Sequence, residues 1–263
     1  MRGEPVHGSV RAAGHPLSIA EWNEQFTRQA AWTRAMRSQL YRRVNLLRAE
    51  RVLDVGCGSG VVTEELAART HGRVIAVDVD AAMIEAAQAR GGQAEYRIGD
   101  VRQLDFPDRY FDVVACHFLL MWVDDAARAV REMARVTRPG GAVLVCGEPD
   151  YGGRVDWPDL PIGQWQAEAL QRQGADPFVG RKLRALLRQA GLDAEVGVIP
   201  SLWDAAALRD NFEDEWALLT RDVAGLVDEA TFKRARDAAW RAIEDGTRLV
   251  FMPVFYGLGR ERA

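Results

Sequence analysis

The sequence is poor in the residues that mark disulfide-rich, zinc-binding or membrane proteins. It contains three cysteines and four histidines in 263 residues, and no two cysteines have C-x-x-C spacing. This usage favours free thiols in a reducing compartment over disulfides or zinc, so we expect a cytoplasmic protein without a bound metal. No apolar stretch approaches the ~20 residues that a membrane-spanning helix needs.

The chain also lacks an excess of basic residues. Its net charge is −4 at pH 7, which gives no electrostatic footprint for nucleic acid. Residues 1–17 contain glycine and proline and have no apolar signal core, so we expect a flexible tail. A chain of this length can bury roughly three-quarters of its unfolded surface in one domain with elaborations.

What the sequence does contain is a glycine-rich turn between a strand and a helix. Arg51–Gly60 has the sequence RVLDVGCGSG, a short apolar run typical of a buried parallel strand followed by three alternating glycines. The next residues, Val61–Arg69, have helical spacing. Without a Cβ atom, Gly56, Gly58 and Gly60 can adopt positive φ and let a ligand approach the backbone. The helix behind them presents its N-terminal N–H groups to that ligand.

The spacing and the acid before the glycines restrict the kind of ligand. The pattern is G-x-G-x-G, whereas a dinucleotide site has G-x-G-x-x-G and a phosphate loop ends in Lys followed by Ser or Thr. Asp54 would repel a pyrophosphate but suits an amino group. The segment D-V-G-C-G-S-G resembles motif I of the class I S-adenosylmethionine-dependent methyltransferases. The resemblance implies an α/β fold with a Rossmann-like seven-stranded sheet and helical cap insertions. It also implies S-adenosyl-L-methionine as cofactor, with Asp54 facing its amino group directly or through water.

Further cofactor residues are expected at the ends of the next two strands. Asp78 ends an apolar run some 18 residues past the last glycine, where a carboxylate accepts hydrogen bonds from both ribose hydroxyls. By the resemblance, Val79 and Met83 flank the adenine ring. The resemblance also implies that Asp100 accepts from the adenine amino group and that the Val101 N–H meets the ring.

The segment before the glycine turn is predicted to be helical. Ile19–Leu47 is a long helical stretch, expected to break into two helices, in which Trp32, Thr33 and Arg37 share one face. In related methyltransferases this segment covers the cofactor, which implies cofactor contacts for Trp32 and Arg37. Arg37 is either the partner of the cofactor carboxylate or a plain surface arginine.

The remaining elements complete the sheet and add to it. We expect strands at Arg73–Asp78, Glu95–Ile98, Phe111–Cys116, Ala142–Cys146, Glu195–Pro200 and Leu249–Leu258, the last of them antiparallel. We expect helices at Ala126–Arg138, Gly163–Gln173 and Val179–Ala190, with about three more within Asp204–Asp245.

These elements divide the chain into four parts. Residues 1–17 are the tail, 18–48 the cofactor-covering helices, 49–153 the cofactor-binding core, and 154–263 the rest of the sheet with a cap. The cap is expected at about 154–177 and 204–245, where tryptophans suit an apolar or planar small molecule.

Three residues are candidates for catalysis. His117 follows the fourth strand, and Glu148 and Tyr151 follow the fifth, so the sheet should bring them to one pocket. His117 is either a general base or a residue that packs beside the cofactor. Glu148, with a pKa raised by burial, or Tyr151 could take the same role.

The expected activity is methyl transfer to a small, apolar or aromatic metabolite, with the methylated atom (O, N or C) left open. The resemblance runs from about Trp32 to Gly153 and is closest to the group that includes quinone-biosynthesis and other small-molecule methyltransferases. No D-P-P-Y or N-P-P-Y follows the fourth strand, which disfavours the DNA amino-methylating enzymes. A cofactor-binding sensor or partner subunit stays open, and an NAD-dependent oxidoreductase is a weaker alternative.

Overall fold

The computed structural model describes residues 18–199 and 202–260, so the tail expected over residues 1–17 lies outside the described residues. The helices are α1 (Ile19–Arg43), α2 (Val61–Ala67), α3 (Ala81–Gln88), α4 (Ala126–Val136), α5 (Ile162–Arg172), α6 (Leu183–Gln189), α7 (Ala205–Asp210), α8 (Phe212–Asp222) and α9 (Glu229–Glu244). Short 3₁₀ helices are η1 (Leu46–Arg48), η2 (Leu120–Trp122), η3 (Tyr151–Gly153) and η4 (Val179–Lys182). The strands are β1 (Arg51–Val55), β2 (Arg73–Asp78), β3 (Glu95–Ile98), β4 (Phe111–Cys116), β5 (Thr137–Pro149), β6 (Val155–Trp157), β7 (Asp193–Ile199), β8 (Leu249–Phe251) and β9 (Val254–Arg260).

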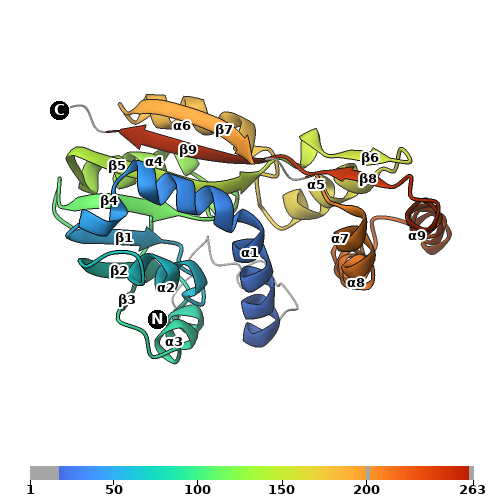
Figure 1. Cartoon of the computed structure of the whole chain (residues 1–263), viewed down its shortest axis with the longest axis horizontal. Coiled ribbons are helices and arrows are strands. Elements are labelled where there is room, and N and C mark those ends of the chain that lie inside the picture. The colour runs from blue at the N-terminus through green and yellow to red at the C-terminus, as the bar shows by residue number, and fades with distance from the viewer. Residues whose placement is uncertain (1–17, 200–201, 261–263) are drawn as a thin grey trace, which may run out of the picture.

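Seven strands form the central sheet, in the order β3-β2-β1-β4-β5-β9-β7. The strands β3, β2, β1, β4 and β5 are parallel to one another, whereas β9 is antiparallel to both β5 and β7. This is the predicted Rossmann-like sheet with its inserted antiparallel strand, and the expectation is confirmed (Figure 1). The carboxyl ends of β1, β4 and β5 point to the same edge of the sheet, where ligands bind in open α/β folds.

The stretch expected to break into two helices is α1, continuous to Arg43, followed by the 3₁₀ helix η1, so the break falls near its end. Ser18 and Glu21 form a reciprocal capping box at the start of α1, and no glycine or proline interrupts its 25 residues. Asn45, in the left-handed conformation with φ 51°, turns the chain away from the helix. Figure 1 shows the helix bending, with its C-terminal part along the sheet and its N-terminal part extending past the edge of the sheet.

Several other boundaries differ from those predicted, among them the fifth strand, expected at Ala142–Cys146 and observed as β5 (Thr137–Pro149), and two of the differences have a clear cause. Helix α4 ends at Val136 and not at Arg138, because Thr137 already pairs with Phe111 as the first residue of β5. The final strand is divided in two, since Pro253 lies between β8 and β9. Proline cannot donate to a ladder, and here the chain leaves one sheet for another. The strand β8 pairs with β6 in a separate two-stranded sheet.

Alternating side chains of the parallel strands bury the two faces of the central sheet. Leu53 and Val114 pack into a cluster with Met133 of α4, while Val52 and Leu144 pack into another with α1 and α2. Two-sided burial explains the near-continuous apolar sequence of these strands.

A second layer of structure, which we call the cap, consists of β6, α5, α7, α8, α9 and β8. Figure 1 shows it beyond the carboxyl ends of β4 and β5. It has its own apolar cluster, formed by residues that include Ile162, Trp165, Phe212 and Trp216. A buried ionic group ties its parts together, since Arg154 pairs with Asp156 at 2.8 Å and with Glu215 of α8 at 3.1 Å. Arg248 pairs with the other oxygen of Asp156 at 2.5 Å.

Candidate functional site

A cavity of about 290 Å³ lies at the carboxyl edge of the sheet, beneath the cap. Its floor comes from the core strands, one wall from α1, and its roof from α5 and α8. Its volume is near the lower end of the ~300–1,000 Å³ typical of small-ligand sites. The shape of the site therefore suits small molecules and not a polymer.

The glycine turn forms part of the floor. Gly56, Gly58 and Gly60 all have positive φ, at 67°, 51° and 83°. A Cβ atom on Gly58 would lie 2.8 Å from the Phe26 ring, and one on Gly56 would collide with Leu119. Gly56 and Gly58 line the cavity, so bare backbone faces the ligand space there.

Gly60 has a different position. It is the N-cap residue of α2 and is not part of the cavity wall, and a Cβ atom there would lie 2.7 Å from the Tyr96 hydroxyl. Its lack of a side chain lets α2 pack closely on the sheet.

Asp54 is a buried carboxylate at the end of β1. It is 1% exposed, lines the cavity and accepts a 2.6 Å hydrogen bond from the Thr63 hydroxyl. Burial raises its pKa to about 7, and the nearby charge of Asp78 adds to the increase. A cation in the cavity would favour the ionised form of this group.

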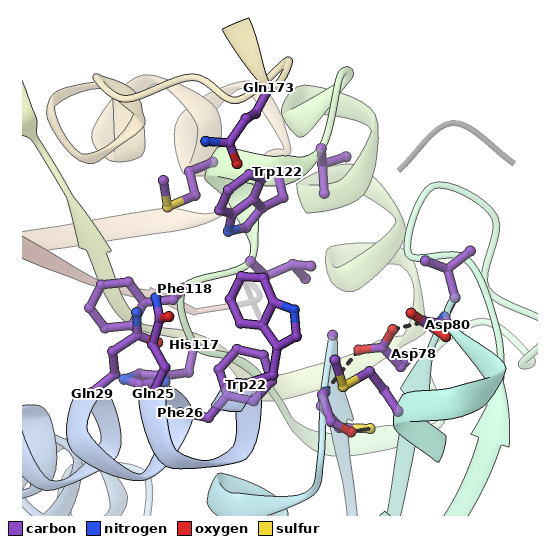
Figure 2. Close-up of a pocket in the computed structure, with 18 of the residues that line it drawn as sticks. Trp22, Gln25, Phe26, Gln29, Asp78, Asp80, His117, Phe118, Trp122 and Gln173 are labelled. Carbon is purple, nitrogen blue, oxygen red and sulfur yellow. Dashed lines mark hydrogen bonds between the residues drawn. The ribbon is translucent and has the colours of Figure 1, made fainter. Parts of the chain in front are cut away.

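Asp78, at the end of β2, holds the glycine turn. Its carboxylate accepts hydrogen bonds from the Gly58 N–H at 2.8 Å and the Asp80 N–H at 3.0 Å, and burial raises its pKa. Figure 2 shows it beside Asp80. Asp80 caps α3 through the Ala82 N–H, and its other oxygen is buried without a hydrogen-bond partner among the described residues.

The predicted adenine residues lie at the same end of the cavity. Val79, Met83, Asp100 and Val101 all line it. Burial alone would raise the pKa of Asp100, but two bonds from Arg102, one of 2.7 Å from its side chain and one of 2.8 Å from its N–H, lower it. The structure thus gathers Asp54, two of the three glycines and these downstream residues around one space.

His117 lines the cavity at the end of β4. Its Nε2 lies 2.8 Å from the Thr33 hydroxyl of α1, and its ring meets Phe118 edge-on. Figure 2 shows it beside Phe118 and Gln29. Burial, and then the nearby Arg37 charge, lower the pKa of His117 well below its ordinary value, so the ring is neutral at physiological pH.

Besides Gly60, three predicted site residues do not reach the cavity. Trp32 packs edge-on against Trp203 with ring centroids 5.8 Å apart, and Arg37 is buried in an ion pair with Glu65. Neither of them lines the cavity. Arg37 is therefore not the plain surface arginine that was the alternative, because it is 1% exposed.

The third such residue, Glu148, is turned away from the ligand space. Its carboxylate is fully buried and accepts from the N–H groups of Leu119, Leu120 and Met121 at 2.9, 2.7 and 3.3 Å. Burial raises its pKa to about 8, opposed by these bonds. This carboxylate holds η2 in place and is not among the cavity residues. Tyr151 does line the cavity, and burial raises its pKa to about 12.

Helix positions that the sequence analysis did not assign supply much of the wall. On α1 they are Trp22, Gln25, Phe26 and Gln29, on α5 and its C-cap Gln166, Leu170 and Gln173, and on α8 Leu218, Arg221 and Asp222. Each set recurs every three or four residues, so each forms one helix face. The helical periodicity of these residues could be seen in the sequence. It did not show whether such a helix face lines a cavity or packs in the hydrophobic core.

The described part of the chain has neither a metal-binding cluster nor a helix that could span a membrane. No group of three His, Cys, Asp or Glu side chains within residues 18–199 and 202–260 is placed to hold a metal ion. In the same part of the chain, no helix has the length and apolar character needed to span a membrane. Cys57, Cys116 and Cys146 are buried free thiols.

Comparisons with known proteins agree with this geometry. Residues 53–145 match a family described as a methyltransferase domain. The chain is 31% identical over 182 residues to an uncharacterised methyltransferase of Schizosaccharomyces pombe, covering 63% of this chain and 64% of that protein. It is 40% identical over 115 residues to a demethylmenaquinone methyltransferase of Mycolicibacterium gilvum, covering 44% and 47%. The chain thus spans about half to two-thirds of the length of these relatives.

A solved structure shares the fold at lower identity. Phosphoethanolamine N-methyltransferase 2 of Haemonchus contortus, solved with phosphomonomethylethanolamine and S-adenosylhomocysteine, superposes with a TM-score of 0.60 and 16% identity. The match covers 88% of this chain and 53% of that one. Together with the central sheet and the glycine turn, the family match identifies residues 53–145 as a methyltransferase domain.

Proposed function

We propose that this protein transfers a methyl group from S-adenosylmethionine to a small organic acceptor. One observation carries the proposal: a buried carboxylate, Asp54, and a partly buried one, Asp78, meet a side-chain-free glycine turn at one cavity. An ammonium group suits Asp54, and a vicinal diol suits Asp78. A nucleoside that carries an amino-acid group has both an ammonium and a vicinal diol. A pyrophosphate has neither, and both acids would repel it.

The residues present fit the cofactor at each of its parts. Asp54 would bind the amino group, Gly56 and Gly58 would lie against the methionine chain, and Asp78 would accept from the ribose hydroxyls. Val79, Met83, Asp100 and Val101 would surround the adenine.

Bound there, S-adenosylmethionine supplies a methyl carbon that leaves sulfur with the C–S electron pair remaining on sulfur. The chain's task is to align the acceptor with that carbon and to exclude water. Trp22 and Phe26 stack with centroids 5.4 Å apart on one wall, and Phe118 and Trp122 line the others. Such alignment can contribute up to ~7–11 kcal/mol to the reduction of the barrier.

His117 fits a wall role better than a base role. A base must accept a proton, and burial beside Arg37 disfavours the imidazolium that would form. We therefore assign His117 to positioning, through its bond to Thr33. Tyr151, whose phenol stays protonated at neutral pH, can orient an acceptor by donating a hydrogen bond.

A small acceptor is supported by the volume of the cavity and by the relatives. The demethylmenaquinone methyltransferase is named for a small quinone precursor, and the Haemonchus contortus enzyme for a small phosphorylated amine. A sensor that binds the cofactor without transfer would share every cofactor residue, so activity must be measured directly.

The test has two stages. Isothermal titration should show micromolar binding of S-adenosylhomocysteine and none of NAD. The protein should then move labelled methyl from S-adenosylmethionine into the small-molecule fraction of a cell extract. Tight NAD binding would favour an oxidoreductase, and cofactor binding without transfer in any extract would favour a sensor.

A further inference from the structure

The roof of the cavity contains hydrogen-bond acceptors that no described residue satisfies. Resting on the proposed function, we propose that the methyl acceptor is a small amine. Its ammonium group binds the Asp222 carboxylate and the Gln173 side-chain carbonyl, and its apolar body lies among the aromatic rings of the wall.

Asp222 is the first of these acceptors. It is the last residue of α8, lines the cavity, and accepts no hydrogen bond from any residue in the described part of the chain. It is close enough to Tyr151 to raise the pKa of that phenol. Burial raises the pKa of Asp222 itself to about 6, against a smaller lowering by Arg221, so the group is ionised at neutral pH.

Gln173 is the second acceptor. Its Nε2 donates to the Ala169 carbonyl at 3.3 Å, which fixes the orientation of the amide. Its Oε1 is buried and has no hydrogen-bond partner among the described residues. Figure 2 shows this side chain next to Trp122, at the end of the cavity away from Asp78. An oriented, unsatisfied carbonyl calls for a donor from a ligand.

The cations near the roof are engaged elsewhere. Arg221 lies 3.2 Å from Glu21, and Arg154 is held between Asp156 and Glu215. Arg102 binds Asp100 and Asp124. The carbonyl end of α8 also places negative partial charge beside Asp222. A carboxylate or phosphate ligand would meet the like charge of Asp222 there.

The aromatic side chains of the cavity wall suit the apolar part of an amine ligand. Trp22, Phe26, Phe118 and Trp122 line the same cavity, and their ring faces attract cations as well as bury apolar groups. An aryl- or alkyl-ethylamine presents both features in one small molecule.

The experiment compares probes that differ only in their polar group. Phenethylamine, 2-phenylethanol and phenylacetate, and the matched set tryptamine, tryptophol and indole-3-acetate, are titrated into protein saturated with S-adenosylhomocysteine. We expect at least one amine to bind tenfold or more tightly than its alcohol and its carboxylate. Equal binding across a set, preference for the carboxylates, or no amine binding would overturn the inference.

Two variants locate the interaction. Asp222→Asn should weaken amine binding tenfold or more and leave the Kd for S-adenosylhomocysteine within twofold. Asp214→Asn, an equal charge change on the exposed side of the same helix, should change neither. An unchanged amine affinity in Asp222→Asn would contradict the assignment. Failure of the wild type to bind S-adenosylhomocysteine would instead overturn the proposed function, and this inference with it.

Discussion

The Thr33 hydroxyl oxygen lies 2.8 Å from His117 Nε2 and also accepts a hydrogen bond from the Arg37 guanidinium. The hydroxyl proton is donated to the Gln29 carbonyl at 3.0 Å. Because that proton is used, the bond to His117 must come from the ring, so Nε2 carries the hydrogen and Nδ1 holds the lone pair. The Gln29 carbonyl, by taking the Thr33 proton, thereby fixes the tautomer of a residue in the cavity wall. Arg37, paired with Glu65, holds the hydroxyl oxygen.

Replacing Thr33 with valine should destabilise the protein, because Arg37 and His117 would each lose an acceptor inside the structure. Leaving buried donors unsatisfied costs ~1–3 kcal/mol. Thermal unfolding should show a lower Tm. Thr27→Val is the matched control, since Thr27 makes the same bond to the carbonyl four residues earlier but is exposed. Equal effects of the two substitutions would contradict the network.

Removing the ring with His117→Ala tests its role in turnover. As a positioning residue with a disfavoured imidazolium, it should contribute less than tenfold to kcat. Steady-state kinetics and titration of S-adenosylhomocysteine measure the two effects separately. A loss of two orders in kcat with unchanged cofactor affinity would identify a general base, and a collapse of affinity would place His117 against the cofactor.

Binding of S-adenosylhomocysteine should depend on pH through Asp54. Since the pKa of this buried acid is raised to about 7, its carboxyl is protonated below that pH and ionised above it. An ammonium ligand prefers the ionised form, so affinity should rise as pH increases towards 7 and level off above it. Below pH 7 the Kd should increase by about tenfold per unit for one linked proton.

The control for this titration is 5′-methylthioadenosine, which has the adenine and ribose but no amino group. Its affinity should lack the Asp54 dependence, and any contribution from Asp78 would appear in both ligands. Asp54→Asn should flatten the profile of S-adenosylhomocysteine. Parallel profiles for the two ligands would remove Asp54 from the ammonium site.

Asp78→Ala should weaken S-adenosylmethionine binding tenfold or more, which is a loss of at least ~1.4 kcal/mol. The substitution also removes the acceptor of two N–H groups, so the structural cost needs a control. Asp112→Ala offers one, because Asp112 likewise accepts from two N–H groups, at 3.0 and 2.7 Å, but at the opposite end of the sheet. Isothermal titration should show weakened binding for Asp78→Ala alone.

Gly58→Ala should impair cofactor binding beyond the cost of its backbone conformation. The new methyl group would lie 2.8 Å from Phe26 and push this ring into the cavity. Gly174→Ala introduces the same type of strain, at φ 83°, with no atom within 4 Å. We expect the control to lose ~1 kcal/mol of stability and to keep its cofactor affinity. Equal cofactor affinities of the two variants would mean that the Phe26 ring moves aside without entering the cavity.

The core of the fold was predictable because its signals are local. The strands β2, β3 and β4 have the bounds expected from apolar runs. The same local patterns placed Asp54, Asp78 and Asp100 at strand ends, where topology brings them together.

The errors came from tertiary context. Nothing in the local sequence shows that Arg37 faces Glu65 rather than a ligand, since both need an arginine on the inner face of α1. Glu148 could be foreseen as buried, but the three N–H groups that it binds come from a segment 27 to 29 residues away. Whether Asp222 and Gln173 reach the cavity depends on how α8 and α5 pack over the sheet, which no local sequence pattern shows.

The cap has an apolar cluster and a buried ionic group of its own, and meets the cavity through single helix faces. The acceptor-binding and cofactor-binding parts of the molecule can therefore change independently in evolution. Substitutions on the inner faces of α5 and α8 can redirect the protein to a new acceptor without rebuilding the glycine turn. A change in the turn would instead disable every acceptor at once. The roof is the part of this molecule in which new specificities can arise by small steps.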